Sequence, residues 1–246
     1  MTKNKIINII IDNIKTLIGA LVIAVLIRSL IIQPFYIPSS SMEPTLLVGD
    51  RIFVSKYTYG YSKHSFPFSP NVSSKRFFSK NPMQGDLVVF KTPADNRTDY
   101  IKRLVGLPGD EIQFINGNLY INESLIPRRS VKISEPVRCG DYLLDTNSFI
   151  ETLPNGVEHL VSYKKKGTLK NTKKYVVPTN HFFLMGDNRD CSKDSRYLGD
   201  VGYVKKLNLV GKAKIIFFSN DTKKGSMLKI WNLNNSLRYK RTFKKL

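Results

Sequence analysis

Cysteine, histidine and tryptophan are scarce in this chain of 246 residues, which has two cysteines, three histidines and one tryptophan. Cys139 and Cys191 allow one intramolecular disulfide at most, and the sequence does not show whether they pair. The histidines His64, His159 and His181 stand singly, at no spacing typical of zinc ligands. We therefore expect neither a metal site nor a cofactor.

Acidic residues are also few, with 19 Asp and Glu against 39 Lys and Arg and a formal net charge of +20. Such an excess of positive charge favours a polyanionic neighbour, which can be nucleic acid or anionic lipid. Composition alone does not separate these two partners. The length allows one or two domains with a sizeable core, and no internal repeat is evident.

An apolar run near the N-terminus carries no charge from Thr16 to Ile27 and stays apolar after Arg28 and Ser29. Thr16 to about Tyr36 is close to the ~20 residues that a membrane helix needs. No small-residue cleavage site follows the run, so we expect an uncleaved anchor and not a removed signal peptide. A buried helix of a soluble protein is the alternative that the interruption by Arg28 leaves open.

The charges on either side of this run predict its orientation. Residues 1–15 are net positive, whereas residues 33–50 carry only Glu43 and Asp50. The positive-inside bias therefore places residues 1–15 in the cytosol and everything beyond the anchor, residues 16–36, on the outer side. A chain anchored in this way meets lipid and not DNA, so we expect a phospholipid membrane as a partner and no nucleic acid.

The rest of the chain is predicted to be mainly β, because β-branched and aromatic runs alternate with turn signals and few long helical patterns occur. Residues 111–115 and 118–121 flank Asn116-Gly117 and predict a hairpin. We expect an antiparallel β domain built from residues 37–121 and 181–219, with an inserted β subdomain over 122–180. Further strands are predicted over 51–57, 86–91, around Lys102, and over 181–185 and 214–218.

Two segments fit the strand pattern poorly. Residues 58–84 mix aromatic and basic side chains without periodicity, which is typical of a loop at an anionic headgroup layer, although a partly packed surface loop has the same composition. The basic tail, residues 220–246, also contains Trp231, Tyr239 and Phe243. Its composition suits contact with a membrane surface.

Three consecutive serines, Ser39, Ser40 and Ser41, follow the apolar run between Pro38 and Pro44. The prolines bar continued helix and hold the hydroxyls on a stiff turn. A polar loop after a membrane helix is the ordinary interpretation. The alternative is a nucleophile, which requires a nearby base. The residues alone do not distinguish the three serines.

Lys102 is the candidate base, because it lies within an otherwise apolar strand. Side chains alternate along a strand, so Tyr100, Lys102 and Leu104 share one face. Burial between apolar neighbours lowers the pKa of a lysine and leaves a neutral amine that can accept a proton. Arg103, on the other face, cannot do this because its guanidinium stays protonated. A lysine that extends to solvent at a strand edge is the alternative.

A third stretch, residues 185–197, is dense in polar side chains directly after a buried strand. The three stretches, in this order after an apolar run, resemble the type I signal peptidases, which are membrane-bound Ser/Lys endopeptidases of bacteria. The resemblance is carried by Pro-Ser-x-Ser-Met-x-Pro-Thr at 38–45, Tyr-Ile-Lys-Arg at 100–103, Gly-Leu-Pro-Gly-Asp at 106–110, Gly-Asp-Asn-Arg-Asp at 186–190 and Ser-x-Asp-Ser-Arg at 192–196.

The resemblance implies a role for six residues. Ser41 would be the nucleophile and Lys102 the general base, while the Ser39 hydroxyl and the Ser41 backbone N–H would form an oxyanion hole. Ser192 would hydrogen-bond the lysine amine. Asp194 and Arg196 would form a supporting ion pair.

The activity that the resemblance implies is cleavage of N-terminal signal peptides from exported preproteins, after small residues at the first and third positions before the cut. The enzyme would act on the outer, periplasmic side of a bacterial inner membrane. A self-cleaving Ser/Lys repressor is one alternative, but it would carry a DNA-binding domain in place of the apolar run. An inactive basic membrane-surface module is another, disfavoured by the intact Ser41, Lys102 and Ser192. A histidine-based serine hydrolase is disfavoured because no Gly-x-Ser-x-Gly occurs.

Overall fold

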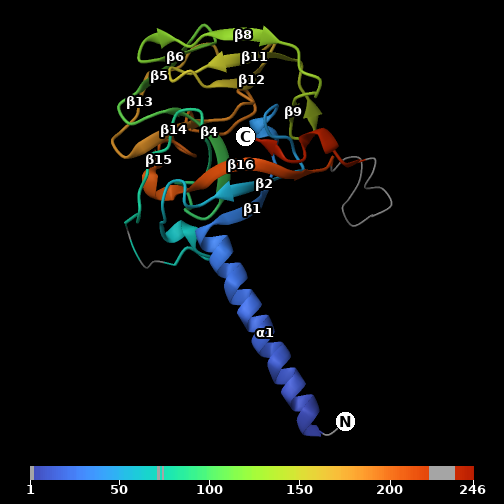
Figure 1. Ribbon diagram of the computed structural model, residues 1–246. Helices are drawn as coiled ribbons and strands as arrows, with labels where there is room; N and C mark the ends of the chain where they lie inside the picture. Colours follow the sequence, from blue (N-terminus) through green and yellow to red (C-terminus); the bar gives the residue numbers. More distant parts are fainter. Residues whose placement is uncertain (1–2, 71–72, 74, 222–235) are drawn as a thin grey trace.

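The computed structural model describes residues 3–70, 73, 75–221 and 236–246. A long N-terminal helix, α1 (Lys3–Leu30), extends from a β domain, and the C-terminus lies within that domain (Figure 1). The predicted fold class is confirmed, because the chain is mainly β, with an apolar N-terminal helix and a curled antiparallel sheet.

Residues Ile7–Leu30 of α1 are long and apolar enough to cross a membrane, with a mean hydropathy of 2.1. Apart from Ser29 and Leu30 at its end, every residue of this segment is exposed in the described structure, unlike a core helix of a soluble domain. The helix ends earlier than predicted. Ile32–Tyr36, expected in the anchor, form strand β1 and pair with β2 (Asp50–Ser55). Pro34 is compatible with an edge strand but not with a continued helix.

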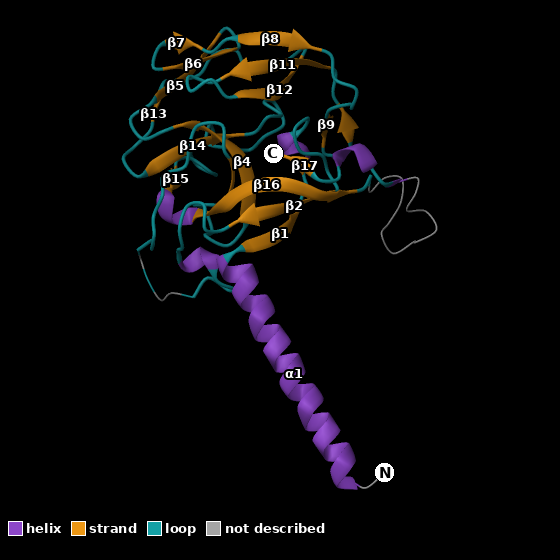
Figure 2. Cartoon of the chain, in the orientation of Figure 1, coloured by secondary structure: helices purple, strands orange, loops and turns teal. Residues whose placement is uncertain are grey.

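An antiparallel sheet of eight strands forms the main layer of the domain, in the order β1-β2-β16-β3-β4-β14-β15, with β17 beside β16 (Figure 2). Strand β16 has register shifts against both of its long neighbours. Such bulges bend a strand and increase its twist, consistent with the curl of the sheet. The remaining bounds are β3 (Leu87–Lys91), β4 (Asp99–Gly106), β14 (His181–Met185), β15 (Val204–Lys205), β16 (Leu209–Ser219) and β17 (Lys244–Lys245).

Smaller sheets cover one side of the main layer. Four strands pair in the order β13-β5-β6-β7, three in the order β12-β11-β8, and two as β10-β9. Their bounds are β5 (Glu111–Ile115), β6 (Asn118–Ile121), β7 (Ser124–Leu125), β8 (Arg128–Val131), β9 (Arg138–Cys139), β10 (Tyr142–Leu143), β11 (Thr146–Thr152), β12 (Glu158–Lys164) and β13 (Tyr175–Val176).

The predicted hairpin occurs at the predicted residues, with Asn116 and Gly117 both at positive φ. Its strands β5 and β6 pair with β13 and β7, which belong to the segment 122–180. The domain boundary predicted at residue 121 therefore falls inside a sheet. Pairing across that position could not be read from the hairpin itself, because a hairpin pattern does not identify the outer neighbours of its strands.

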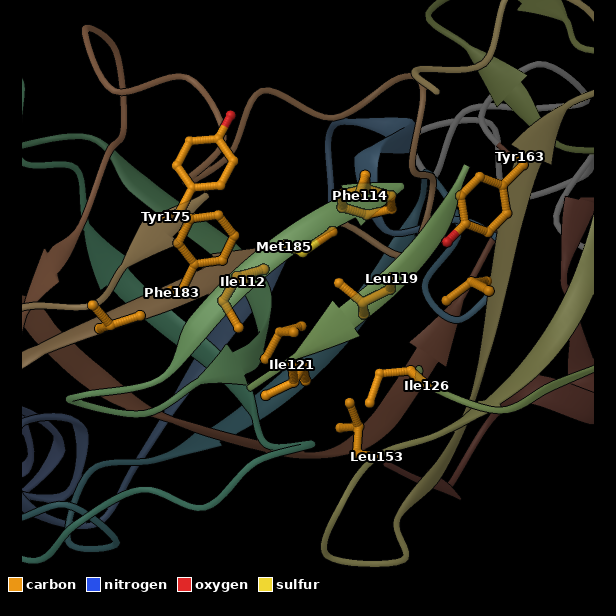
Figure 3. Packing of buried hydrophobic residues seen from close by; sticks show 13 residues of the cluster. Ile112, Phe114, Leu119, Ile121, Ile126, Leu153, Tyr163, Tyr175, Phe183 and Met185 are labelled. Atoms are coloured by element: carbon orange, nitrogen blue, oxygen red, sulfur yellow. The ribbon is translucent and has the colours of Figure 1, made fainter. Parts of the chain in front are cut away.

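A shared core joins the small sheets to the main sheet (Figure 3). Ile112, Phe114 and Leu119 of the hairpin pack with Phe183 and Met185 of β14, and all five are almost fully buried. Burying a side chain of this size contributes roughly 1.5–3 kcal/mol. The strand at 181–185 is thus buried on both faces, as its continuous apolar run predicts.

The segment 58–84 is packed at its base and exposed at its tips. The buried Tyr59 donates its hydroxyl to Asp86 at 2.8 Å, and Arg76 donates to the carbonyls of Gly60 and Leu209. A short 3-10 helix, η2, spans Lys63–Ser65. The Phe68 side chain is fully exposed, with a relative accessibility of 104%.

The described part of the tail packs on the β domain. Arg241, in the 3-10 helix η5 (Tyr239–Arg241), forms an ion pair with Asp50 at 2.5 Å, and β17 pairs with β16. Trp231, which the membrane-contact prediction included, lies outside the described residues. Contact between this tail and lipid stays a prediction.

Candidate active site

The three serines of the loop after β1 have different surroundings, and only one of them meets Lys102. Ser40 and Ser41 lie in a 3-10 helix, η1 (Ser40–Met42). The Ser40 hydroxyl accepts the backbone N–H of Gly140 at 3.1 Å. The Ser41 Oγ lies 2.5 Å from the Lys102 Nζ and 3.2 Å from the Ser39 Oγ. The geometry therefore distinguishes Ser41, which the residues alone did not.

Apolar burial and hydrogen bonds from Asn188 fix this serine loop. Met42 and Leu46 are almost completely buried in the cluster beneath β2 and β16. Asn188 donates its backbone N–H to the Ser41 carbonyl at 3.2 Å and its side-chain amide to the Ser40 carbonyl at 3.0 Å. Asn188 lies in the quoted motif at 186–190, but sequence reasoning gave it no role.

Lys102 lies on β4 with its amine inside the protein, and the residue is 4% exposed. Burial lowers the pKa of Lys102 to about 8. Repulsion from Arg196 acts in the same direction, while attraction from Asp194 and Asp187 opposes it. A substantial fraction of the amine is consequently neutral near pH 8.

Both carboxylates that act on Lys102 are already paired with arginines. Arg196 donates two hydrogen bonds to Asp194, each at 2.8 Å, and Arg103 donates two to Asp187, at 2.8 and 2.7 Å. Burial opposes ionisation, but the Arg196 guanidinium holds the pKa of Asp194 below its ordinary value. The ion pair expected between Asp194 and Arg196 is present.

The Arg103–Asp187 pair connects the strand that bears Lys102 to the polar loop after β14. Arg103 points away from Lys102, as strand alternation predicts, and also donates to the Gly85 carbonyl at 2.8 Å. The guanidinium of Arg103 holds the pKa of Asp187 low against the effect of burial. Sequence reasoning noted that Arg103 cannot be a base but did not find this positioning contact.

Ser192 differs from the expectation. Its hydroxyl is buried and makes no hydrogen bond of normal geometry to Lys102 or to any other described residue, although its proximity to Asp194 helps to lower the pKa of that carboxyl. The Ser192 side chain packs against Gly186, where an added Cβ would overlap both Ser192 and the Ser41 carbonyl. Close packing around Gly186 thus places Ser192 beside the loop that holds Ser41.

Two clefts meet at Ser41. One, of about 410 Å³, is lined by Ser39, Ser41, Lys102 and a set of apolar side chains: Phe35, Ile37, Met42, Ile52, Val89, Tyr100 and Ile101. The other, of about 480 Å³, is lined by Ser39, Ser40, Ser41, Arg138, Gly140 and Asp141. Ser41 therefore lies where the two clefts adjoin, and Ser39 lines both of them as well.

A disulfide between Cys139 and Cys191 lies beside both clefts. It answers the question of pairing that the sequence left open. Cys139 belongs to β9, whereas Cys191 belongs to the polar loop that holds Ser192. The bond therefore connects the wall of the second cleft to the loop beside Ser41 and Lys102.

The histidines are engaged elsewhere. His64 hydrogen-bonds with Ser69 at 3.0 Å, and His159 lies 3.7 Å from Glu151 in a buried cluster. Over residues 3–221 and 236–246, apart from 71, 72 and 74, no three His, Cys, Asp or Glu side chains gather as metal ligands would. The expectation of no metal and no cofactor stays a prediction.

Residues 10–218 match the family described as "Signal peptidase, peptidase S26". The chain therefore belongs to the signal peptidase family S26 and is an enzyme of that peptidase family. The resemblance stated from the three motifs is confirmed.

Similar proteins are named Signal peptidase I. The Signal peptidase I of Rickettsia bellii (strain OSU 85-389) is 40% identical over 252 residues, covering 94% of this chain and 84% of the relative. That of Rickettsia typhi is 42% identical over 212 residues, covering 80% of this chain and 76% of the relative. The crystal structure of a signal peptidase I from Enterococcus faecalis V583 is 27% identical, with a TM-score of 0.33, and covers 54% of this chain and 97% of the other.

Proposed function

We propose that this chain is a membrane-bound serine endopeptidase that removes N-terminal signal peptides from exported preproteins. Ser41 is the nucleophile and Lys102 the general base. The observation that carries the proposal is the 2.5 Å contact between the Ser41 Oγ and the Lys102 Nζ, inside a site that excludes water from the amine. Family membership supports the class of substrate.

The first half-reaction transfers the acyl group to Ser41. The neutral Lys102 amine accepts the Ser41 proton while the Oγ attacks the carbonyl carbon of the scissile peptide. The C–N bond then breaks, and the Lys102 ammonium gives its proton to the departing amine of the mature protein. The product is an ester between Ser41 and the signal peptide.

The second half-reaction hydrolyses that ester. Lys102, neutral again, takes a proton from a water molecule that attacks the ester carbonyl. The tetrahedral intermediate collapses, the ester C–O bond breaks, and the proton returns to the Ser41 Oγ. We assign Ser192 to accepting an N–H from the charged Lys102 during this cycle, because its buried hydroxyl is otherwise uncommitted.

The developing oxyanion is stabilised by the Ser39 hydroxyl and the Ser41 backbone N–H. The Ser39 Oγ lies 3.2 Å from the Ser41 Oγ, and Ser39 lines both clefts. Donors placed in this way are worth about 2.7–4 kcal/mol in the transition state. Family membership supports small side chains at the first and third positions before the cut, and the apolar cleft beside Lys102 is where they would bind.

The anchor places this site at a membrane. The exposed apolar face of α1 supports a single membrane crossing, with residues 1–15 in the cytosol and the β domain on the periplasmic side. The alternative of a self-cleaving repressor lacks support, because an apolar helix occupies the position of its DNA-binding domain.

The test is to incubate the purified full chain in detergent with a preprotein and to locate the cut by mass spectrometry. We expect one cut after a small-x-small sequence, releasing the intact signal peptide. Ser41→Ala should release none, whereas Ser40→Ala should retain most of the rate. Equal cleavage by Ser41→Ala and the parent chain would refute the proposal.

A further inference from the structure

A cavity of about 470 Å³ lies where α1 joins the β domain, apart from the catalytic pair. Its walls come from the end of α1, from β1, from the segment around η2 and from the turn between β3 and β4. Figure 1 shows the segment around η2 beside the domain end of α1. Two hydrogen bonds hold this junction: Tyr61 donates to the Leu30 carbonyl at 2.9 Å, and the Lys56 N–H to the Ile31 carbonyl at 3.1 Å.

The cavity carries an uncompensated positive charge. Arg28, Lys56, Lys91 and Arg97 line it together with a single carboxylate, Asp99. Lys91 pairs with Asp99 at 2.9 Å, which leaves three cations without an acid. Among the described residues, the guanidinium of Arg28 and that of Arg97 make no hydrogen bond or ion pair.

Lys56 is the buried member of this set. Within the part of the chain that the structure describes, its amine donates only to backbone carbonyls, to Ser65 at 2.9 Å and to His64 at 3.5 Å. Burial lowers the pKa of Lys56 to about 8; attraction from Asp99 opposes this shift, and repulsion from Arg28 and Lys91 adds to it. A cation held in this way is stabilised by an anion that enters the cavity.

Two lining residues also carry buried polar atoms without partners. The Ser29 Oγ and the His64 Nε2 make no hydrogen bond in the described structure, and these residues are only 3% and 4% exposed. A buried polar group without a partner costs about 1–3 kcal/mol. A ligand rich in oxygen atoms removes that cost and neutralises the surrounding cations.

We propose that this cavity binds the phosphate group of an anionic phospholipid. The location favours lipid over a free anion, because the apolar span ends at Leu30 and the cavity begins there, at the depth of the headgroups. Phe66 and Phe68, which also line the cavity, expose their rings to the surroundings and suit the neighbouring acyl layer. The inference rests on the proposed membrane crossing and not on the catalytic assignment.

The headgroup cavity also shares a wall with the substrate cleft. Phe35 and Asp99 line both of them. A lipid held at Arg28 and Arg97 therefore sets the catalytic cleft at a defined height above the bilayer, close to the depth at which a signal peptide leaves it.

The test compares lipid retention by two doubly substituted full chains. Arg28→Gln/Arg97→Gln removes two cations of the cavity, and Lys132→Gln/Lys166→Gln removes the same charge from exposed positions of the inserted segment. Each chain in neutral maltoside micelles is titrated with phosphatidylglycerol, and the bound lipid is counted by native mass spectrometry. We expect one tightly held lipid on the parent and the control, and binding at least ~10-fold weaker on the cavity variant.

A parallel titration with inorganic phosphate distinguishes the sources of phosphate. We expect phosphate at equal concentration to displace little phosphatidylglycerol, since it lacks the acyl chains. Equal lipid binding by the cavity and control variants would overturn the proposal. Displacement of the lipid by equimolar phosphate would overturn the assignment to lipid. Cleavage of a preprotein in the same micelles is a separate measurement, so failure of the catalytic proposal leaves this one intact.

Discussion

At the scale of single residues, the surroundings of Lys102 explain how a lysine can be a base. Asp194 and Asp187 act on its amine, but Arg196 and Arg103 neutralise both carboxylates. Desolvation therefore outweighs attraction, and the pKa falls from 10.5 to about 8. The difference corresponds to about 3 kcal/mol against the ammonium form.

Ser39→Ala tests the oxyanion assignment. Loss of one donor at the developing oxyanion should lower kcat by ~10²–10³ with little change in KM, because the hydroxyl acts mainly in the transition state. Steady-state kinetics on a preprotein peptide measure both constants. Ser39→Thr keeps a hydroxyl and should retain much of the rate. A rise in KM at constant kcat for Ser39→Ala would instead mean that Ser39 only binds substrate.

Local rules singled out Lys102, whereas Ser41 was singled out only by the resemblance to a known family. Strand alternation is a local rule, so it placed Lys102 and Arg103 on opposite faces, as the structure does. Ser39, Ser40 and Ser41 share one turn. What distinguishes Ser41 is its contact with Lys102, 61 positions further along the chain. The positioning role of Asn188 depends on the same kind of distant contact.

At the scale of elements, patterns with a local cause were predicted well. The hairpin over 111–121 follows from Asn-Gly between alternating strands, and the strand at 181–185 from its apolar run. The division of the N-terminal apolar run into a helix and a following strand was not predicted. Residues 32–36 leave the helix because β2 offers them a pairing partner, and that partner is not visible in their own composition.

The disulfide between β9 and the polar loop should stabilise the site. Cys139 and Cys191 are 52 positions apart, and closing a loop of that length is worth about 4 kcal/mol in the chain-entropy account. We expect Cys139→Ser/Cys191→Ser to lower the Tm and to raise the KM. The KM should rise because the wall of one cleft is then no longer covalently linked to the polar loop. A reductant should shift the Tm of the parent in the same direction.

The double variant is the control for that measurement, since a reductant should leave its Tm unchanged. An unchanged melting curve of the parent under full reduction, verified by thiol titration, would contradict this account of the bond.

At the scale of the whole molecule, the described residues form one long apolar helix followed by a β domain. The positive flank of residues 1–15 predicts a cytosolic N-terminus and a periplasmic β domain. Protease added to spheroplasts should digest residues beyond β1 and spare a tag placed at the N-terminus. Permeabilised cells, in which both sides are accessible, are the control. Protection of the β domain in sealed spheroplasts would show the opposite topology. It would also contradict the assignment of exported preproteins as substrates.

The central claim, that Lys102 is a neutral general base, is tested most directly by Lys102→Arg together with the pH profile of the parent. The amine accepts a proton only when neutral, so the parent rate should rise with pH through about 8 and fall in acid. Lys102→Arg should be inactive at every pH, because an arginine pKa of ~12.5–13.8 leaves no free lone pair. Lys174→Arg, an exposed conservative control, should keep the parent rate. Substantial cleavage by a folded Lys102→Arg chain would contradict the claim.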